Sequence, residues 1–265
     1  MPGVTLLVFR EVLEASLIIA IICAATRGVT HRGRYVASGI GLGLAGALLV
    51  AAGAGFIAGL ARGAGQELFN ASVLLGAVVM IGWHVLWMSR HGRELTTRMN
   101  ALGSAVTAGT SSLRVLLVVI ALAVLREGSE IVLFLNGMAV GGAGATALIG
   151  GIALGIGGGS IVGLAMYFGL MRIPIRRFFC VTNWMLVLLA AGLASTAARF
   201  LVQADLLPAW GSQLWNTTRL LSNGSLGGRT LGLLVGYDAS PSGVQLLFYT
   251  TTLLLLLVGM HRRAR

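Results

Sequence analysis

Two short motifs carry half of the acidic residues of this sequence. Arg10-Glu11-Val12-Leu13-Glu14 and Arg126-Glu127-Gly128-Ser129-Glu130 both read Arg-Glu-x-x-Glu, and they hold four of the eight acidic residues of the chain. On a helix, the two glutamates of each motif are three residues apart and share a face, and the arginine lies four residues before the second glutamate. Carboxylate oxygens are the donors that hard cations prefer. The motifs therefore predict a cation site.

The expected metal ligands are the four motif glutamates, supported by the two motif arginines: Glu11, Glu14, Glu127 and Glu130, with Arg10 and Arg126. An arginine stays protonated, so it would offset the repulsion between carboxylates in the empty site and limit how tightly a cation is held. Two different roles stay open at this point. The charges could form interhelical salt bridges that only lock two helices together, or a proton relay without metal.

Both motifs lie inside apolar segments. The 265 residues are 57% hydrophobic and 10% charged, with a mean hydropathy of +0.91, whereas soluble domains carry about 25% charged residues. Six motif charges in a bilayer would cost about 15–20 kcal/mol if nothing compensated them. We expect an all-α integral membrane protein, a single polytopic domain with seven transmembrane helices at about 4–25, 36–61, 68–89, 115–140, 145–171, 180–203 and 244–261.

The basic residues predict the orientation of these helices. All nineteen are arginine, and thirteen of them flank alternate ends of the expected helices, against four at the opposite ends. The positive-inside rule then places the N-terminus outside, the C-terminus in the cytoplasm and the loops at 26–34, 90–112 and 172–178 inside. The net charge of +11 therefore needs no nucleic acid. The N-terminus does not read as a cleavable signal, and Cys23 and Cys180 suggest neither a disulfide nor a thiolate metal site.

An internal repeat relates the two halves of the chain. The motifs are 116 residues apart, and the same offset superposes glycine stripes that recur every fourth residue near 39–59 and 151–163. We expect repeat A at about 4–89 and repeat B at about 115–203, followed by an external loop at about 204–243 that has room for a short surface helix. Because each unit has three helices, the second copy would be inverted, as in many secondary transporters. The stripes are expected to let helix backbones approach closely.

Three further residues are weaker candidates for the ion path. His84 lies among tryptophans that read as an interfacial belt near the cytoplasmic end of its helix, so a structural role is favoured over an exit-path role. Glu67 and Asp238 are expected near the outer mouth, where ordinary loop charge is favoured over a cation vestibule. Asn183 is expected to form a hydrogen bond between helices.

The paired motifs resemble the oxidase-dependent iron transporter family, the high-affinity iron permeases with bacterial ferrous/ferric branches. All six charged positions match the family motif Arg-Glu-Gly-Leu-Glu, although Val12 replaces its glycine and Ser129 its leucine. The segments at 83–88 and 236–242 also resemble the bacterial branch. The resemblance implies iron import across the cytoplasmic membrane with the motif glutamates as ligands, beside periplasmic iron-binding and haem-peroxidase proteins or a ferroxidase.

The sequence therefore predicts an iron permease in the cytoplasmic membrane, with iron as cargo, lipid around it and no permanently bound cofactor. A different metal such as lead or manganese stays open as the cargo. Two functions of a different class also stay open. One is an intramembrane carboxylate-metal enzyme, although no His-Glu-x-x-His or Gly-x-Ser-x-Gly occurs, and the second is an assembly subunit of a redox complex. The oxidation state of the iron, the energy coupling and a homo-oligomeric state are not decided by the sequence.

Overall fold

Helices are the only regular secondary structure in the part of the chain that the structure describes. The computed structural model describes residues 2–60, 65–168, 175–211 and 213–264, and within these ranges it has eight helices and no strand. The helices are α1 (Pro2–Ala25), α2 (Arg32–Leu60), α3 (Gln66–Thr107), α4 (Leu113–Val140), α5 (Ala145–Tyr167), α6 (Ile175–Gln203), α7 (Leu226–Val235) and α8 (Gly243–Ala264). The expectation of an all-α chain is confirmed.

Seven of these helices are long, and five of them contain stretches apolar enough to cross a membrane. These five stretches are Arg32–Phe56, Gln66–Trp87, Ala145–Tyr167, Val181–Gln203 and Gly243–His261. Helices α1 and α4 are of similar length, but each carries the three charges of one motif near its middle. The chain is a multi-pass membrane protein.

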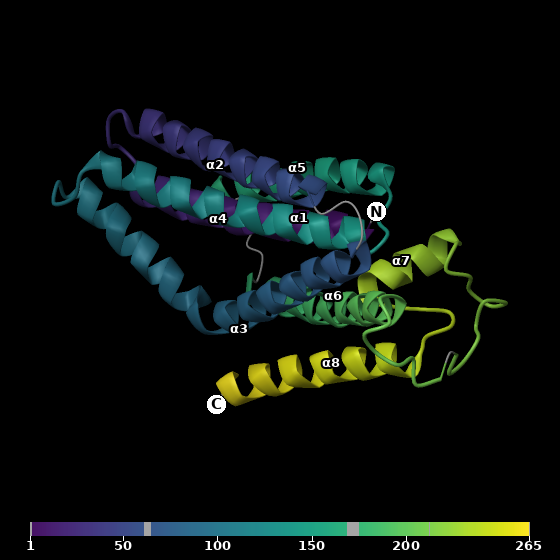
Figure 1. Cartoon of the computed structure of the whole chain (residues 1–265). Helices are drawn as coiled ribbons and strands as arrows, with labels where there is room; N and C mark the ends of the chain where they lie inside the picture. The colour runs from purple at the N-terminus through teal and green to yellow at the C-terminus, as the bar shows by residue number, and fades with distance from the viewer. Residues whose placement is uncertain (1, 61–64, 169–174, 212, 265) are drawn as a thin grey trace.

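Helix α3 differs from the expectation, because the predicted loop at 90–112 is mostly helical. The helix continues to Thr107 and has 42 residues, which corresponds to about 63 Å at 1.5 Å per residue, twice the thickness of a bilayer core. Figure 1 shows that the helix changes direction after its apolar half and returns towards the start of α4. The arginines in this segment end the membrane span, but the segment has no proline that would end the helix.

The glycine stripes bring helices into close contact, as expected. Helix α5 packs on α1 and α2 packs on α4. A Cβ added to Gly155 would lie 2.6 Å from Val8 Cβ, and one added to Gly43 would lie 2.6 Å from Val124 Cβ. Real carbon atoms do not approach so closely, so only glycine fits at these positions. Each motif helix is therefore packed against the stripe from the opposite half of the chain, α1 against α5 and α4 against α2.

The contacts correct the register of the repeat. The stripe of α5 faces α1, with Gly151, Gly155 and Gly159 against Val4, Val8 and Val12. The stripe of α2 faces the equivalent positions of α4, with Gly39, Gly43 and Ala47 against residues 120, 124 and 128. Equivalent positions of α1 and α4 are thus 116 residues apart, whereas equivalent positions of α2 and α5 are 112 residues apart. The connection at 141–144 is shorter than the one at 26–31, and a stripe of period four fits either offset. Sequence alone could not detect this shift of one turn.

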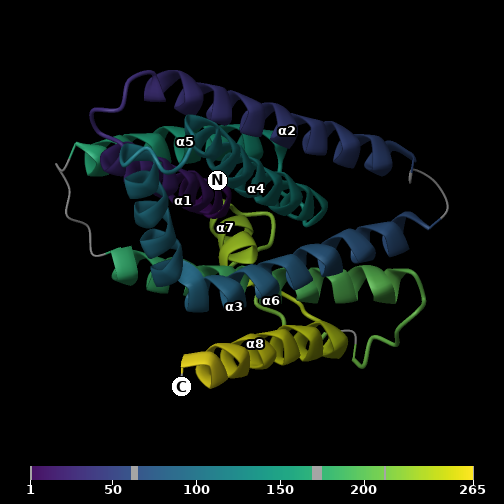
Figure 2. The same ribbon diagram turned by 90° about the vertical axis from the view of Figure 1, so that its left-hand side faces the viewer.

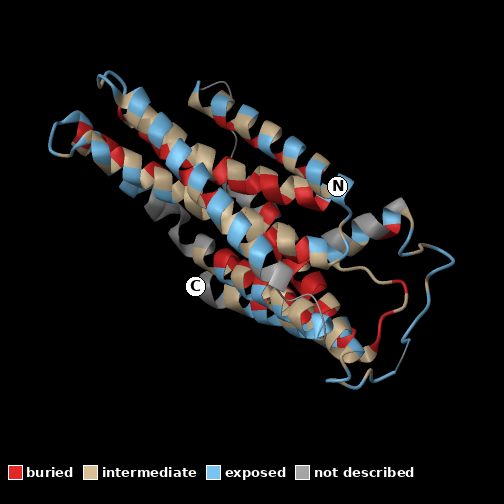
Figure 3. Cartoon of the chain, turned by 45° about the horizontal axis from the view of Figure 1, so that its top comes forward, coloured by how far each residue is buried: buried red, intermediate tan, exposed pale blue. Residues whose placement is uncertain are grey.

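Two apolar clusters enclose the middle of α1 and α4. One includes Val8 of α1 and Phe134 of α4, with residues of α3 and α6. The second includes Ile18 of α1 and Ile120 of α4, near the opposite ends of these two helices. Figure 2 shows α1, α2, α4 and α5 on one side of the molecule, with α3, α6 and α8 stacked below them. Buried residues gather where these helices face one another (Figure 3). The motifs lie between the two clusters.

Candidate metal centre

The two motifs meet at the interface of α1 and α4. Of the charged side chains, Glu11 is 0% exposed, Arg10 1% and Glu127 3%. Oxygens of Glu11, Glu127 and Glu130 lie within 4.8 Å of one another, and so do donor atoms of Glu11, Glu14 and His84. The structure therefore brings together all four predicted glutamates. It also adds a histidine from a third helix.

The first motif is closed around its own arginine. Arg10 Nη1 lies 2.9 Å from Glu11 Oε1, and Arg10 Nη2 lies 2.8 Å from Glu14 Oε1. The same Nη2 donates a longer hydrogen bond, 3.4 Å, to Asn183 Oδ1 of α6, so the expectation that Asn183 bonds between helices is confirmed. A guanidinium cannot accept a hydrogen bond, so the groups that contact the two terminal nitrogens of Arg10 are its acceptors.

The second motif is more open. Arg126 Nε donates to Glu130 Oε1 at 3.1 Å and lies 3.9 Å from Glu127 Oε1. Its guanidinium carbon lies 4.4 Å from the centre of the Trp87 ring, a cation–π contact that holds the charge to one side. The Arg126 side chain is 37% exposed. It therefore lies at the rim of the cluster, whereas Arg10 lies inside it.

His84 joins the two motifs. Its Nε2 lies 2.6 Å from Arg10 Nη2, and its Nδ1 contacts Glu130 Oε2. Because arginine is only a donor, a hydrogen bond between these two atoms has Nε2 as its acceptor, which requires the tautomer with the proton on Nδ1. His84 is only 3% exposed and lies among the charged side chains of the cluster. Its neighbour Trp83, 74% exposed, is the one that faces outwards.

Two carboxylate oxygens in the cluster lack any partner among the described residues. Within that part of the chain, Glu11 Oε2 and Glu127 Oε2 are fully buried, accept no hydrogen bond and take part in no ion pair. Buried anionic oxygens left without a partner are costly. They come from different motifs and lie in the set of three glutamates that spans both helices. This set has the donor chemistry of a hard-cation site.

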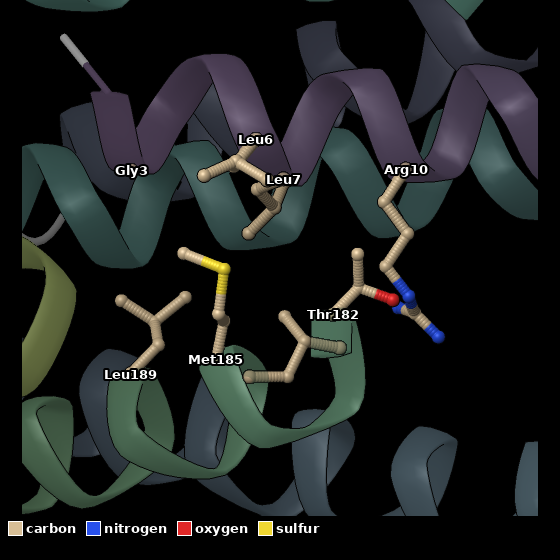
Figure 4. Close-up of a pocket in the computed structure, with 8 residues that line it drawn as sticks. Gly3, Leu6, Leu7, Arg10, Thr182, Met185 and Leu189 are labelled. Carbon is tan, nitrogen blue, oxygen red and sulfur yellow. The ribbon is translucent and has the colours of Figure 1, made fainter. Parts of the chain in front are cut away.

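The cluster is reached from two sides by cavities of unequal size. A cavity of about 500 Å³ is lined by His84, Trp87, Arg126 and Glu130, together with apolar residues of α3. A much smaller one, about 20 Å³, lies between α1 and α6. Figure 4 shows Leu6, Leu7, Met185 and Leu189 pointing towards one another along it, with Arg10 at one end. The larger cavity is thus lined partly by charged residues of the cluster, and the smaller one is apolar apart from Arg10 and Thr182.

Glu67 and Asp238 do not join the cluster. Glu67 is exposed in the first turn of α3. Asp238 accepts hydrogen bonds from Asn223 at 2.8 Å, from the Ser240 amide at 3.1 Å and from Gln245 at 3.2 Å. Burial raises the pKa of Asp238, but these hydrogen bonds outweigh it and the pKa lies below its ordinary value. Asp238 organises the loop before α8.

The chain is similar to known proteins along most of its length. Residues 1–261 match the family described as "Iron permease FTR1 family". The proteins named ferrous iron permease EfeU from Escherichia coli O6:H1 and Yersinia pestis are 33% and 32% identical to the chain, over 89% of it and over 87% and 85% of their own lengths. The protein of that name from Shigella sonnei is 32% identical over 89% of the chain and 87% of its own length. No solved structure matches the chain.

Proposed function

The chain belongs to the iron permease FTR1 family, and we propose that it imports iron through the cluster formed by its two motifs. In this proposal Glu11, Glu14, Glu127 and Glu130 are the iron ligands along the path, and the two motif arginines support them. As a member of a permease family the chain is a transporter rather than an enzyme. Iron is its cargo and not a resident cofactor.

One observation carries the proposal most directly. Glu11 Oε2 and Glu127 Oε2 are buried without partners among the described residues, and they belong to different motifs on different helices. A purely structural salt bridge would pair its buried oxygens, because an unpaired anion in a membrane interior destabilises the fold. A metal ion between the motifs would satisfy both. A salt bridge alone leaves these two oxygens without a partner.

The cargo is proposed to be Fe²⁺. The relatives from Escherichia coli and Yersinia pestis carry the name ferrous iron permease. Carboxylate oxygens together with an imidazole suit divalent iron, whereas Ca²⁺ and Mg²⁺ prefer oxygen alone. Manganese, which also accepts oxygen ligands, is the natural competitor, and lead is a second one. An iron-binding or iron-oxidising partner, which the family resemblance implies, would meet the chain at the 204–242 segment.

The proposed topology has seven spans, an inverted repeat of three plus three helices and an external N-terminus in the cytoplasmic membrane. In support, the N-terminus and the 204–242 segment lie at one end of the molecule, and the connections at 26–31 and 108–112 lie at the opposite end (Figure 1). An impermeant thiol reagent tests this in a chain without Cys23 and Cys180. A cysteine at Ser222 should react in intact cells and one at Ser111 should not. The reverse result would overturn the orientation.

The function itself is tested with the purified chain in proteoliposomes. Fe²⁺ supplied outside under anaerobic conditions should accumulate inside when this chain is the only protein present. Competition with Mn²⁺ and Pb²⁺ in the same vesicles measures the preference for iron. If the vesicles take up no metal although the chain is folded, the role as an assembly subunit replaces the transporter.

A further inference from the structure

We propose that the centre contains two overlapping cation positions that share Glu11, and that the guanidinium of Arg10 occupies one of them when no metal is bound there. This inference rests on the proposed function, because it concerns how iron would move through the same cluster. The first position, called here the open position, is formed by Glu11, Glu127 and Glu130. The second, called the arginine-filled position, is formed by Glu11, Glu14 and His84. The donor atoms within each set lie no more than 4.8 Å apart.

Arg10 takes the place of a cation in the arginine-filled position. Its two terminal nitrogens contact all three donor residues: 2.9 Å to Glu11 Oε1, 2.8 Å to Glu14 Oε1 and 2.6 Å to His84 Nε2. These residues are the ones that a metal in this position would bind. With its side chain only 1% exposed, Arg10 has little access to water that could replace these contacts. A metal can enter only when the guanidinium moves away.

Arg126, the equivalent of Arg10 in the second repeat, does not fill the open position. It contacts Glu130 through Nε alone and lies against Trp87, with 37% of its side chain exposed. The oxygens Glu11 Oε2 and Glu127 Oε2 keep no partner among the described residues. The two arginines are related by the repeat, yet only one of them fills a set of ligands.

The charges give the two positions an order. When all four carboxylates are ionised, they and the two guanidiniums leave a net charge of −2, which one Fe²⁺ in the open position neutralises. A second Fe²⁺ beside a retained Arg10 would leave +2 in a membrane interior, which is strongly unfavourable. Iron would therefore bind first in the open position and pass to Glu14 and His84 only as Arg10 withdraws. Glu11 belongs to both sets, so it can keep hold of the ion during the transfer.

The number of ions bound per chain tests this inference. We would measure it by equilibrium dialysis of Fe²⁺ under anaerobic conditions with the purified full chain. The wild-type chain should bind about one ion and Arg10→Gln about two, because the second set of ligands becomes free. Arg126→Gln is the matched control: it removes the same charge but opens no ligand set, so it should still bind about one. Mn²⁺ bound to Arg10→Gln should give the electron paramagnetic resonance signal of a close pair of ions.

A second comparison does not need a stable Arg10 variant. Glu14→Gln and Glu127→Gln each remove one carboxylate charge, but only Glu127 belongs to the open position. Glu127→Gln should therefore bind the first Fe²⁺ at least about tenfold more weakly than Glu14→Gln. Both should lose uptake, because Glu14 is needed for the second position.

The outcomes separate this inference from the proposed function. A folded wild-type chain that binds no Fe²⁺ would overturn both. A wild-type chain that binds one ion, with Arg10→Gln and Arg126→Gln behaving alike, would overturn the two overlapping positions and leave the transporter intact. If Arg10→Gln does not accumulate in the membrane, the two glutamate variants decide instead. Equal losses of Fe²⁺ affinity in Glu14→Gln and Glu127→Gln would then overturn the two overlapping positions.

Discussion

The two Arg-Glu-x-x-Glu motifs have the same charges at the same spacing but different surroundings. In the first, Arg10 is buried and contacts both of its glutamates, a histidine and an asparagine. In the second, Arg126 lies at the rim, over Trp87. The difference comes from α3 and α6: α3 supplies His84 to the first motif and Trp87 to the second, and α6 supplies Asn183 to the first. Two motifs with the same charges in the sequence can thus acquire unequal roles in the fold.

The helices that support the two motifs show a complementary difference. Val12 of the first motif packs against Gly159, where an added Cβ would lie 2.9 Å from Val12 Cβ. Gly128 of the second motif packs against Ala47, at a corresponding distance of 2.6 Å. Each contact has one glycine: in the first contact it lies on the supporting helix α5, and in the second it lies on the motif helix α4. This explains why the first motif tolerates valine where its family motif has glycine: the space is provided by α5.

The largest effect is expected from the motif glutamates, and it should be equally large in both motifs. Glu14→Gln and Glu130→Gln keep size and hydrogen bonding but remove a charge and a hard ligand. Each should lower Fe²⁺ uptake into proteoliposomes about 100-fold or more while the amount of folded protein in the membrane changes little. A purely structural salt bridge predicts the opposite pattern, with loss of folded protein.

A charge swap extends this test. Arg10→Glu combined with Glu14→Arg restores the ion pair but moves the ligand by one helical turn. It should recover folding without recovering uptake. Normal uptake at normal expression would mean that the glutamate at position 14 is not on the path of the metal.

The two arginines should differ in their effect on stability. Arg10→Gln leaves buried carboxylates without their partner and should destabilise the protein by about 3–5 kcal/mol. Arg126→Gln breaks a partly exposed pair and should cost about 1 kcal/mol or less. Thermal unfolding of the two variants in the same detergent measures the difference. Equal losses would show that the surroundings of the motifs do not distinguish them.

A smaller loss of stability should follow from filling the contact that positions the first motif. Gly155→Leu would drive a side chain into Val8 and should cost about 1–3 kcal/mol through overpacking, lowering the yield of folded protein. Gly157→Leu is the matched control, because no atom lies within 4 Å of a Cβ added there. Fluorescence-detected size-exclusion chromatography compares them. If both variants fold and transport normally, the stripe does not support the motif.

The smallest effect is expected from a carboxylate outside the cluster. Asp238→Asn should destabilise the loop before α8 by roughly 1 kcal/mol, a small value because the side chain is partly exposed. It should change Fe²⁺ uptake less than about twofold. Since the pKa of Asp238 is lowered in the fold, its stabilising effect is present above its ordinary pKa and is lost as the pH falls through the lowered value. Hydrogen exchange of residues 236–242 at neutral and acidic pH measures this. Loss of uptake would give Asp238 a place on the ion path.

The sequence predicts the glutamates and arginines of the site because charges inside apolar segments require a compensating partner. It predicts the close helix contacts because glycines recur at helical spacing. It could not place His84, since that depends on how α3 is rotated towards the cluster, and the neighbouring tryptophans suggested a membrane interface. Nor could it predict that α3 continues to Thr107, because the arginines that end a membrane span do not end a helix.

The position of iron in the folded chain tests the central claim most directly. Crystals soaked anaerobically with Fe²⁺ and measured on either side of the iron absorption edge would locate the ion by its anomalous scattering. The account predicts a peak between α1 and α4, about 2 Å from oxygens of Glu11, Glu127 and Glu130, with Arg10 still bound to Glu14. A fully occupied peak elsewhere, with no anomalous signal beside Glu11 and Glu127, would contradict it.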